Sequence, residues 1–182
     1  MSSQASLPFT GTERITAALG DIEHSWITTL DNMATIEIAS EQAHAVLSAL
    51  KNDAQFEANT LVTAIDHFPA EPRFQMVWQL LSLQHNERIR VYAKLDSTEP
   101  SVGTCIDLWP GAAFGERECY DMFGIHFEGH NNLRRLLMPD GYDHHPLRKD
   151  FPHQGIQPDR LYREWDDERR SKWEADEKGG QA

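Results

Sequence analysis

The clearest hydrophobic pattern in the chain is an alternation of apolar and polar side chains in its middle third. Residues 88–95 show it best, with two interleaved sets: Ile89, Val91, Ala93 and Leu95, and Arg88, Arg90, Tyr92 and Lys94. This period of two predicts a half-buried β-strand with one solvated face. Residues 60–68, ended by Pro69, and residues 73–83 are predicted as two further strands.

The first third of the chain adds two predicted helices and two predicted strands. Residues 40–52 show the spacing of an amphipathic helix, with apolar positions at Ala43, Val46, Leu47 and Leu50. Ser40 is its expected N-cap, and a shorter helix should run from an N-cap at Thr12 to Gly20. Strands are expected at 25–30 and 34–38. The element order predicts an α+β fold, with a mainly antiparallel sheet, helices packed on one face, and a long extended C-terminal arm.

A third helix is predicted from Pro110 to about Phe123, after a short strand at Cys105–Leu108. Gly124 should end it in the left-handed conformation. Its apolar stripe carries one carboxylate: Ala112, Glu116, Cys119 and Phe123. Because a buried carboxylate without a partner is costly, we expect Glu116 to have a cationic or donor partner, with the nearby Arg134 and Arg135 as candidates. Arg117 and Asp121 are expected to form a separate i, i+4 pair.

After Phe127 the periodicity fades, and residues 129–157 contain a single apolar cluster: Leu133, Leu136, Leu137 and Met138. A loop this long is uncommon in a compact domain, and the cluster favours an arm that lies on a partner over a disordered linker. The expected organisation is a disordered N-terminus (1–11), an α+β domain (12–128), a partner-docking arm (129–157) and a charged C-terminal tail (158–182). The tail has two interpretations: a segment laying Leu161, Trp165 and Trp173 on another chain, or a solvated, partly helical end.

Composition limits the function classes. The 182 residues suffice for one hydrophobic core, and the net charge of −12, with neither half basic, argues against nucleic-acid binding. No run approaches the ~18 apolar residues of a membrane span, and the N-terminus lacks a targeting pattern. Two cysteines cannot by themselves hold an iron–sulfur cluster or form a disulfide framework. A cytoplasmic protein with no direct membrane span is expected.

The stretch 116–152 allows two chemical interpretations. A metal site could use its histidines and the following one: His126, His130, His144, His145 and His153. His126 and His130 are four residues apart, but both follow the predicted end of the helix, so the spacing does not place them on one helical face. A catalytic site could use Glu116, Glu118, Asp121 or Cys119, but Glu116 and Glu118 point to different helix faces and Cys119 lies on the apolar stripe. We therefore expect no catalytic, cofactor-binding or metal-binding residue.

The same stretch carries a family resemblance. ERECYDMFGIHFEGHNNLRRLLMPDGYDHHPLRKDFP is similar to the signature of the 30 kDa (bacterial C) subunit of the proton-pumping NADH–quinone oxidoreductase, respiratory complex I. The matching positions form two linked blocks: Glu116, Arg117, Glu118, Asp121, Gly124, Phe127, Gly129, His130, Leu133, Arg135 and Leu136, then Pro146, Leu147, Arg148, Lys149 and Asp150. Phe114, Asn131 and Phe151 depart from the residues usual in the family.

The resemblance implies a peripheral, non-cofactor structural subunit on the cytoplasmic side of the bacterial inner membrane. It implies packing on the 49 kDa (D) subunit and near the iron–sulfur subunits B and I in a hetero-oligomer that moves electrons from NADH to a quinone. FMN and the iron–sulfur clusters would then belong to partner subunits. Two alternatives stay open: the equivalent subunit of a related hydrogenase-type complex, and a stand-alone His/Asp metal-dependent enzyme.

Overall fold

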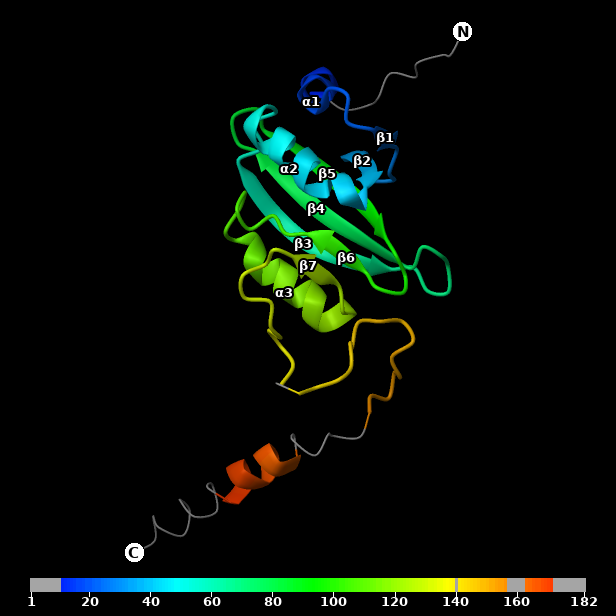
Figure 1. Ribbon diagram of the computed structural model, residues 1–182, viewed down its shortest axis with the longest axis vertical. Helices are drawn as coiled ribbons and strands as arrows, with labels where there is room; N and C mark the ends of the chain where they lie inside the picture. The colour runs from blue at the N-terminus through cyan, green and yellow to red at the C-terminus, as the bar shows by residue number, and fades with distance from the viewer. Residues whose placement is uncertain (1–10, 140, 157–162, 172–182) are drawn as a thin grey trace, which may run out of the picture.

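A mixed five-stranded sheet forms the body of the protein in the computed structural model, which describes residues 11–139, 141–156 and 163–171 (Figure 1). The strands are β1 (His24–Ile27), β2 (Ala34–Ala39), β3 (Ala58–Asp66), β4 (Phe74–Ser82) and β5 (Glu87–Leu95). Their spatial order is β1-β2-β5-β4-β3. Only the β2–β5 pair is parallel, so the expectation of a mainly antiparallel sheet is confirmed.

The alternating pattern of the strands builds one buried face. Ile36, Val91, Trp78 and Val62 pair in register across β2, β5, β4 and β3, and all four are buried. The same face carries the other apolar positions named above for residues 88–95, because successive side chains of a strand point to opposite faces. The five strands predicted for this sheet therefore lie where the pattern placed them, with ends shifted by no more than three residues.

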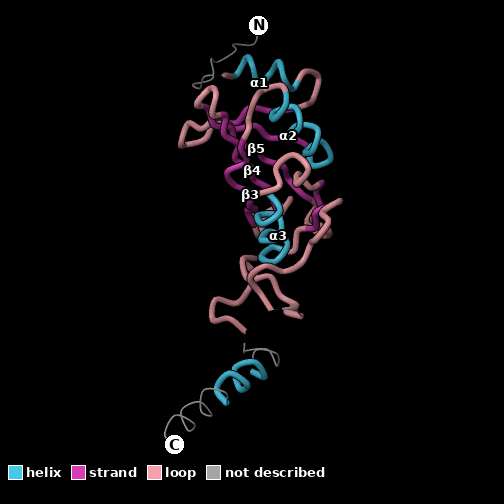
Figure 2. Tube along the Cα trace, turned by 90° about the vertical axis from the view of Figure 1, so that its left-hand side faces the viewer, coloured by secondary structure: helices cyan, strands magenta, loops and turns pink. Residues whose placement is uncertain are grey.

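Three α-helices contribute to the core: α1 (Thr12–Leu19), α2 (Ala43–Asn52) and α3 (Ala112–Phe123). The apolar stripe of α2, from Ala43 to Leu50, joins the same core cluster as the sheet, and Figure 2 shows α2 on one side of the strands. Helix α3 packs closely on β3, since a Cβ at Gly115 would lie 2.8 Å from the Val62 Cβ. A larger side chain at Gly115 would push these two elements apart.

The two predicted N-caps were wrong. Gly11 precedes α1 in a left-handed conformation, and no side-chain cap is formed there. Ser40 begins a short 3-10 turn, η1 (Ser40–Gln42), and Gln42 is the N-cap residue of α2. The chain thus enters α2 through a tightened turn whose geometry a capping pattern does not encode.

A second, two-stranded sheet pairs β6 (Ser101–Gly103) with β7 (His126–Glu128) in parallel, and the sequence pattern missed both strands. The strand expected at Cys105–Leu108 was wrong. The Cys105 carbonyl accepts the N–H groups of Leu108 and Trp109, so this segment is a turn leading into α3. Helix α3 ends as predicted, with Gly124 at φ 77°.

After β7 the described arm residues, 129–139 and 141–156, contain turns and bends but no helix or strand. Residues 163–171 are helical, whereas Leu161 and Trp173, and all but the last residue of the expected disordered N-terminus, lie outside the described residues. Among the described residues, no helix is long and apolar enough to cross a membrane.

Candidate functional site: the clasp between helix α3 and the C-terminal arm

The arm (residues 129–156) runs beside α3 in the same direction as the helix. Its hydrogen bonds to α3 advance along both segments, joining His130 to Ala113, Arg134 and Arg135 to Arg117, Leu136–Met138 to Asp121, Leu147 to Met122, and Arg148 to Phe123. Figure 1 shows the arm gathered around the C-terminal end of α3. The arm therefore contacts its own body along the whole helix, and the expected contacts of the arm with a partner chain stay a prediction.

Asp121 is the centre of this clasp, which we define as Asp121, Arg135 and the N–H groups of residues 136–138. One carboxylate oxygen, Oδ2, accepts the three N–H groups at 3.0, 2.7 and 2.9 Å. The other, Oδ1, accepts a hydrogen bond from the Arg135 guanidinium at 2.7 Å. Asp121 is fully buried although it lies opposite the apolar stripe of α3, so the arm is what covers it.

The charge of Asp121 is stabilised in place. Burial by itself would raise the pKa of this carboxyl, but the N–H groups of Met138 and Leu137 and the Arg135 guanidinium outweigh burial and hold the pKa below its usual range. The exposed i, i+4 pair expected between Arg117 and Asp121 was wrong. Arg117 instead donates to the carbonyls of Arg134 and Arg135, at 3.1 and 2.9 Å.

The arm also caps the C-terminus of α3, whose last turn contains no basic residue of its own. The Asp121 carbonyl accepts hydrogen bonds from His145 Nδ1 at 2.9 Å and from Arg135. The Met122 carbonyl accepts the Leu147 N–H, and the Phe123 carbonyl accepts Arg148 Nε at 2.6 Å. The carbonyls that a helix end leaves unpaired are thus satisfied, and two guanidinium groups lie at the negative end of the helix dipole.

Gly124 lets the arm cross this helix end. Its positive φ disfavours any residue with a side chain. A Cβ there would also lie 2.6 Å from His145 Nε2 and against the Arg148 guanidinium. Both the helix stop and the close passage of the arm therefore require glycine.

A second buried carboxylate, Asp66 at the end of β3, holds the far end of the arm. It accepts the Lys149 N–H at 2.7 Å and two hydrogen bonds from the Arg73 guanidinium at 2.9 and 2.8 Å. Arg73 also pairs with Asp150 of the arm at 2.6 Å. Burial would raise the pKa of Asp66, but Arg73 and the Lys149 N–H lower it well below its usual range.

Glu116 is fully buried and has donor partners, as expected, but the two arginines named as candidates were wrong. Its carboxylate accepts the Thr104 hydroxyl at 2.5 Å and the Cys105 N–H at 2.7 Å. Glu116 therefore fixes the turn before α3 to the helix itself. Hydrogen bonds to donors satisfy a buried carboxylate without a countercharge, and this was not visible from sequence distance.

The other candidate residues are not gathered into a reactive site. Cys105 and Cys119 are buried, and burial raises the pKa of both thiols, so neither forms a thiolate at neutral pH. His130 and His145 donate to backbone carbonyls, while the ring of His144 stacks edge-on with Tyr142 and Phe151. In the part of the chain that the structure describes, no three His, Cys, Asp or Glu side chains are placed to hold a metal ion.

Comparison with known proteins assigns the family. The family model described as "Respiratory-chain NADH dehydrogenase, 30 Kd subunit" matches residues 36–157, which include the body strands β2–β5, α3 and the arm. The chain belongs to this family. It is a subunit of NADH-quinone oxidoreductase, and its resemblance to the 30 kDa subunit is confirmed.

Three curated relatives illustrate the match. The C subunit of the NADH-quinone oxidoreductase of Citrifermentans bemidjiense is 44% identical over 126 residues, 69% of this chain and 77% of the relative. Its counterpart in Methylorubrum populi is 41% identical over 146 residues, 79% of this chain and 66% of the relative. The second C/D protein of the same enzyme in Aquifex aeolicus is 48% identical over 121 residues, 66% of this chain but only 20% of that longer protein.

Two solved structures share the fold. The trypsin-resistant fragment (1–134) of Nqo5 is 28% identical, with a TM-score of 0.56 over 60% of this chain and 89% of the fragment. A chain of an archaeal respiratory complex, the membrane-bound sulfane sulfur reductase, covers 78% of this chain and 83% of its own length with a TM-score of 0.66. At 21% identity the second match shows the fold alone.

Proposed function

We propose that this chain is a non-cofactor structural subunit in the peripheral arm of the proton-pumping NADH–quinone oxidoreductase. In this role it holds neighbouring subunits in register while they carry electrons from NADH through FMN and iron–sulfur clusters to a quinone. It lies on the cytoplasmic side of the bacterial inner membrane, against the 49 kDa (D) subunit and near the iron–sulfur subunits B and I.

The observation that carries this proposal is that residues of the family signature hold the arm against α3. Asp121, Arg117 and Gly124 on α3, and Arg135 and Arg148 on the arm, are all signature positions, and each of them shapes the path of the arm. Because these signature residues fix the shape of a surface segment, they support an architectural role for the chain.

The outer side of the clasped region supports a docking role. Phe114 of α3 is 63% exposed, and Leu137 and Leu147 of the arm are 60% and 51% exposed. Exposed large apolar side chains on a segment without helix or strand are a feature of surfaces that another chain covers. The fused C/D protein of Aquifex aeolicus supports the 49 kDa (D) subunit as one neighbour, since fusion keeps two sequences physically close.

The arm is proposed to become fully ordered only on the partner subunits. Few of its side chains are packed on the core, with Leu133 and Met138 as partly buried examples, and most of its internal contacts are polar. A solved relative, titled the trypsin-resistant fragment of Nqo5, matches 60% of this chain. We propose that a protease-resistant part of this chain is the body and that the arm is more accessible.

Native electrophoresis of solubilised membranes tests the proposal. We expect the chain to migrate in a large assembly that oxidises NADH, and its deletion to remove that assembly. Elemental analysis of the purified chain is expected to show no stoichiometric metal. Migration as a free small protein, or stoichiometric metal in it, would support the stand-alone metal-dependent enzyme instead.

A further inference from the structure

A small pocket in the arm is lined in part by Arg148, a cation that forms no ion pair among the described residues. The pocket has a volume of about 210 Å³, and its lining includes Asp143, His144, His145, Arg148, Asp150 and Phe151. Arg148 is half-buried, and its guanidinium lies 5.2 Å from the centre of the Phe74 ring. Its Nε donates to the Phe123 carbonyl, which fixes the direction of the side chain.

Within residues 11–139, 141–156 and 163–171, no carboxylate forms an ion pair with Arg148. The two carboxylates whose charges act on Arg148 are already paired with another arginine. Asp66 and Asp150 both bind the Arg73 guanidinium, which stacks on the same Phe74 ring at 4.9 Å. Arg148 thus lies beside a second cation whose own carboxylates are in use.

The groups around Arg148 act on its pKa in opposite directions. Burial and the charge of Arg73 lower the pKa of its guanidinium, although Asp150 and Asp66 act in the opposite direction. The neighbouring Asp121 carboxyl is saturated by the clasp and is not directed at this group. Arg148 is partly buried and fixed through Nε, and one of its terminal amines lies close to Gly124. The guanidinium still has further N–H donors with which to bind a carboxylate.

We propose that this pocket receives the carboxylate of an aspartate or glutamate from the subunit on which the arm docks, and that Arg148 is its ion-pair partner. This inference rests on the proposed function, because it needs a second subunit against the arm. It names the chemistry of the contact: an acidic side chain inserted between the Arg148 guanidinium and the rim formed by His144 and Phe151. In this arrangement the arm binds its own body through Asp66 and Asp121 and binds the partner subunit through Arg148.

Zero-length cross-linking tests the proposal in the assembled complex. A carbodiimide activates a carboxylate, and an amine in contact displaces the urea to form an amide, whereas a guanidinium does not react. In the R148K variant we expect an amide between position 148 and an acidic residue of another subunit. The R134K variant, which places an amine on an exposed part of the arm, is the matched control, and the native Lys149 amine is an internal reference.

A second measurement covers the case in which R148K itself weakens docking. R148Q should lower the retention of the chain in the complex during a salt wash by about tenfold relative to R134Q, as expected when one partner of a desolvated charge pair is removed. Equal retention of the two variants overturns the proposal. So does a cross-link from position 148 to Asp143 or Asp150 alone, or to nothing, in a complex that contains the chain. Absence of the wild-type chain from the complex contradicts the proposed function itself.

Discussion

The carboxylate of Asp121 and the guanidinium of Arg135 meet at 2.7 Å, and this contact joins the outer side of helix α3 to the C-terminal arm. Asp121 is fully buried, whereas the Arg135 side chain keeps 15% of its surface exposed. The same carboxylate binds three successive backbone N–H groups. One aspartate therefore accepts backbone N–H groups that a helix or strand would otherwise have paired.

Replacing this carboxylate should loosen the arm while leaving the body folded. D121N removes the charge and directs an amide N–H₂ toward groups that are themselves donors. Amide hydrogen exchange at residues 136–138 should accelerate by about 100-fold, consistent with the loss of roughly 2–3 kcal/mol of charge-assisted hydrogen bonding. E118Q, at an exposed position on the same helix, is the control and should leave the exchange unchanged. Unaltered protection in D121N would show that the arm is held by other contacts.

Acid should weaken the attachment of the arm. The folded-state pKa values of Asp66 and Asp121 are lowered, so both carboxylates contribute stability that is fully present above their unfolded pKa of about 3.9 and is lost as the pH falls below it. The free energy of unfolding, measured by denaturant titration, should therefore fall as the pH is lowered below about 4. The double variant D66N/D121N should be less stable at pH 7 and show a flatter dependence. An equally steep dependence in that variant would assign the effect to other carboxyls.

Glu116 should be required for the stability of the body. In E116Q the amide oxygen can still accept one donor, but the amide N–H₂ faces either the Thr104 hydroxyl or the Cys105 N–H. We expect the free energy of unfolding to fall by about 2–3 kcal/mol, measured by urea titration. E128Q provides the comparison, because Glu128 bonds the Ser101 hydroxyl at an exposed site and should change the stability little. A wild-type urea midpoint for E116Q would contradict this account.

Gly124 should be more sensitive to alanine than another glycine with the same backbone conformation. G124A combines the strain of a positive φ, about 1–2 kcal/mol, with a collision between the new Cβ and the arm. Gly155 has a φ of 71° and open space around it, so G155A carries the strain alone. G124A should lower the melting temperature further than G155A does. Equal decreases in the melting temperature would show that the arm moves away from the new Cβ without loss of stability.

Trypsin should distinguish the isolated chain from the assembled one. We expect the first cuts in the isolated chain to fall in the arm, at Arg134, Arg148 or Lys149, and to leave the α+β body intact. The same sites should be protected within the complex, because partner subunits would cover them. Mass spectrometry of timed digests reads both outcomes. Strong resistance of the arm in the isolated chain would show that the clasp suffices to order it.

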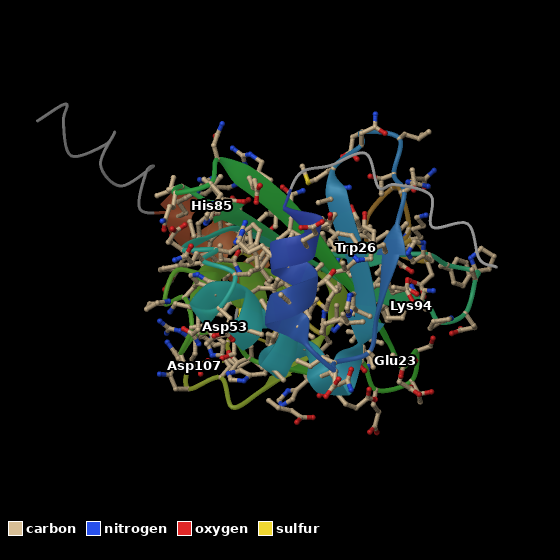
Figure 3. All side chains as sticks on the ribbon, turned by 90° about the horizontal axis from the view of Figure 1, so that it is seen from above. Glu23, Trp26, Asp53, His85, Lys94 and Asp107 are labelled. Carbon is tan, nitrogen blue, oxygen red and sulfur yellow. The ribbon has the colours of Figure 1, made fainter. Side chains whose placement is uncertain are left out.

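The body and the arm differ in charge. Residues 11–128 carry 18 acidic and 7 basic side chains, whereas residues 129–157 carry 3 and 4. Seen from above in Figure 3, Glu23, Asp53 and Asp107 lie at the periphery of the body, and all three are exposed. The arm is thus a nearly neutral, arginine-containing segment on an acidic body, and its Arg135 pairs with a carboxylate of that body, Asp121.

Several features were accessible from sequence because they depend on local periodicity. The strands and helices follow alternating or 3.6-residue patterns, which report the burial of one face wherever that face packs. Gly124 as the end of α3 and the burial of Glu116 follow from the same reasoning. The family could also be identified, because the two signature blocks occur in fixed order. A cue for the clasp was present as well, since Asp121 and Arg135 both belong to that signature.

The tertiary structure decided the rest. By helical spacing Asp121 lies opposite the core and reads as a surface residue, and it is buried only because an irregular arm returns over it. The path of that arm follows from hydrogen bonds between groups far apart in the chain, such as Lys149 with Asp66, and no periodicity encodes these pairings. The same is true of the partners of Glu116 and of the small β6–β7 sheet. Sequence alone determined the strands of the main sheet, the three helices that pack on the core and the family, whereas only packing in three dimensions decided which charges meet.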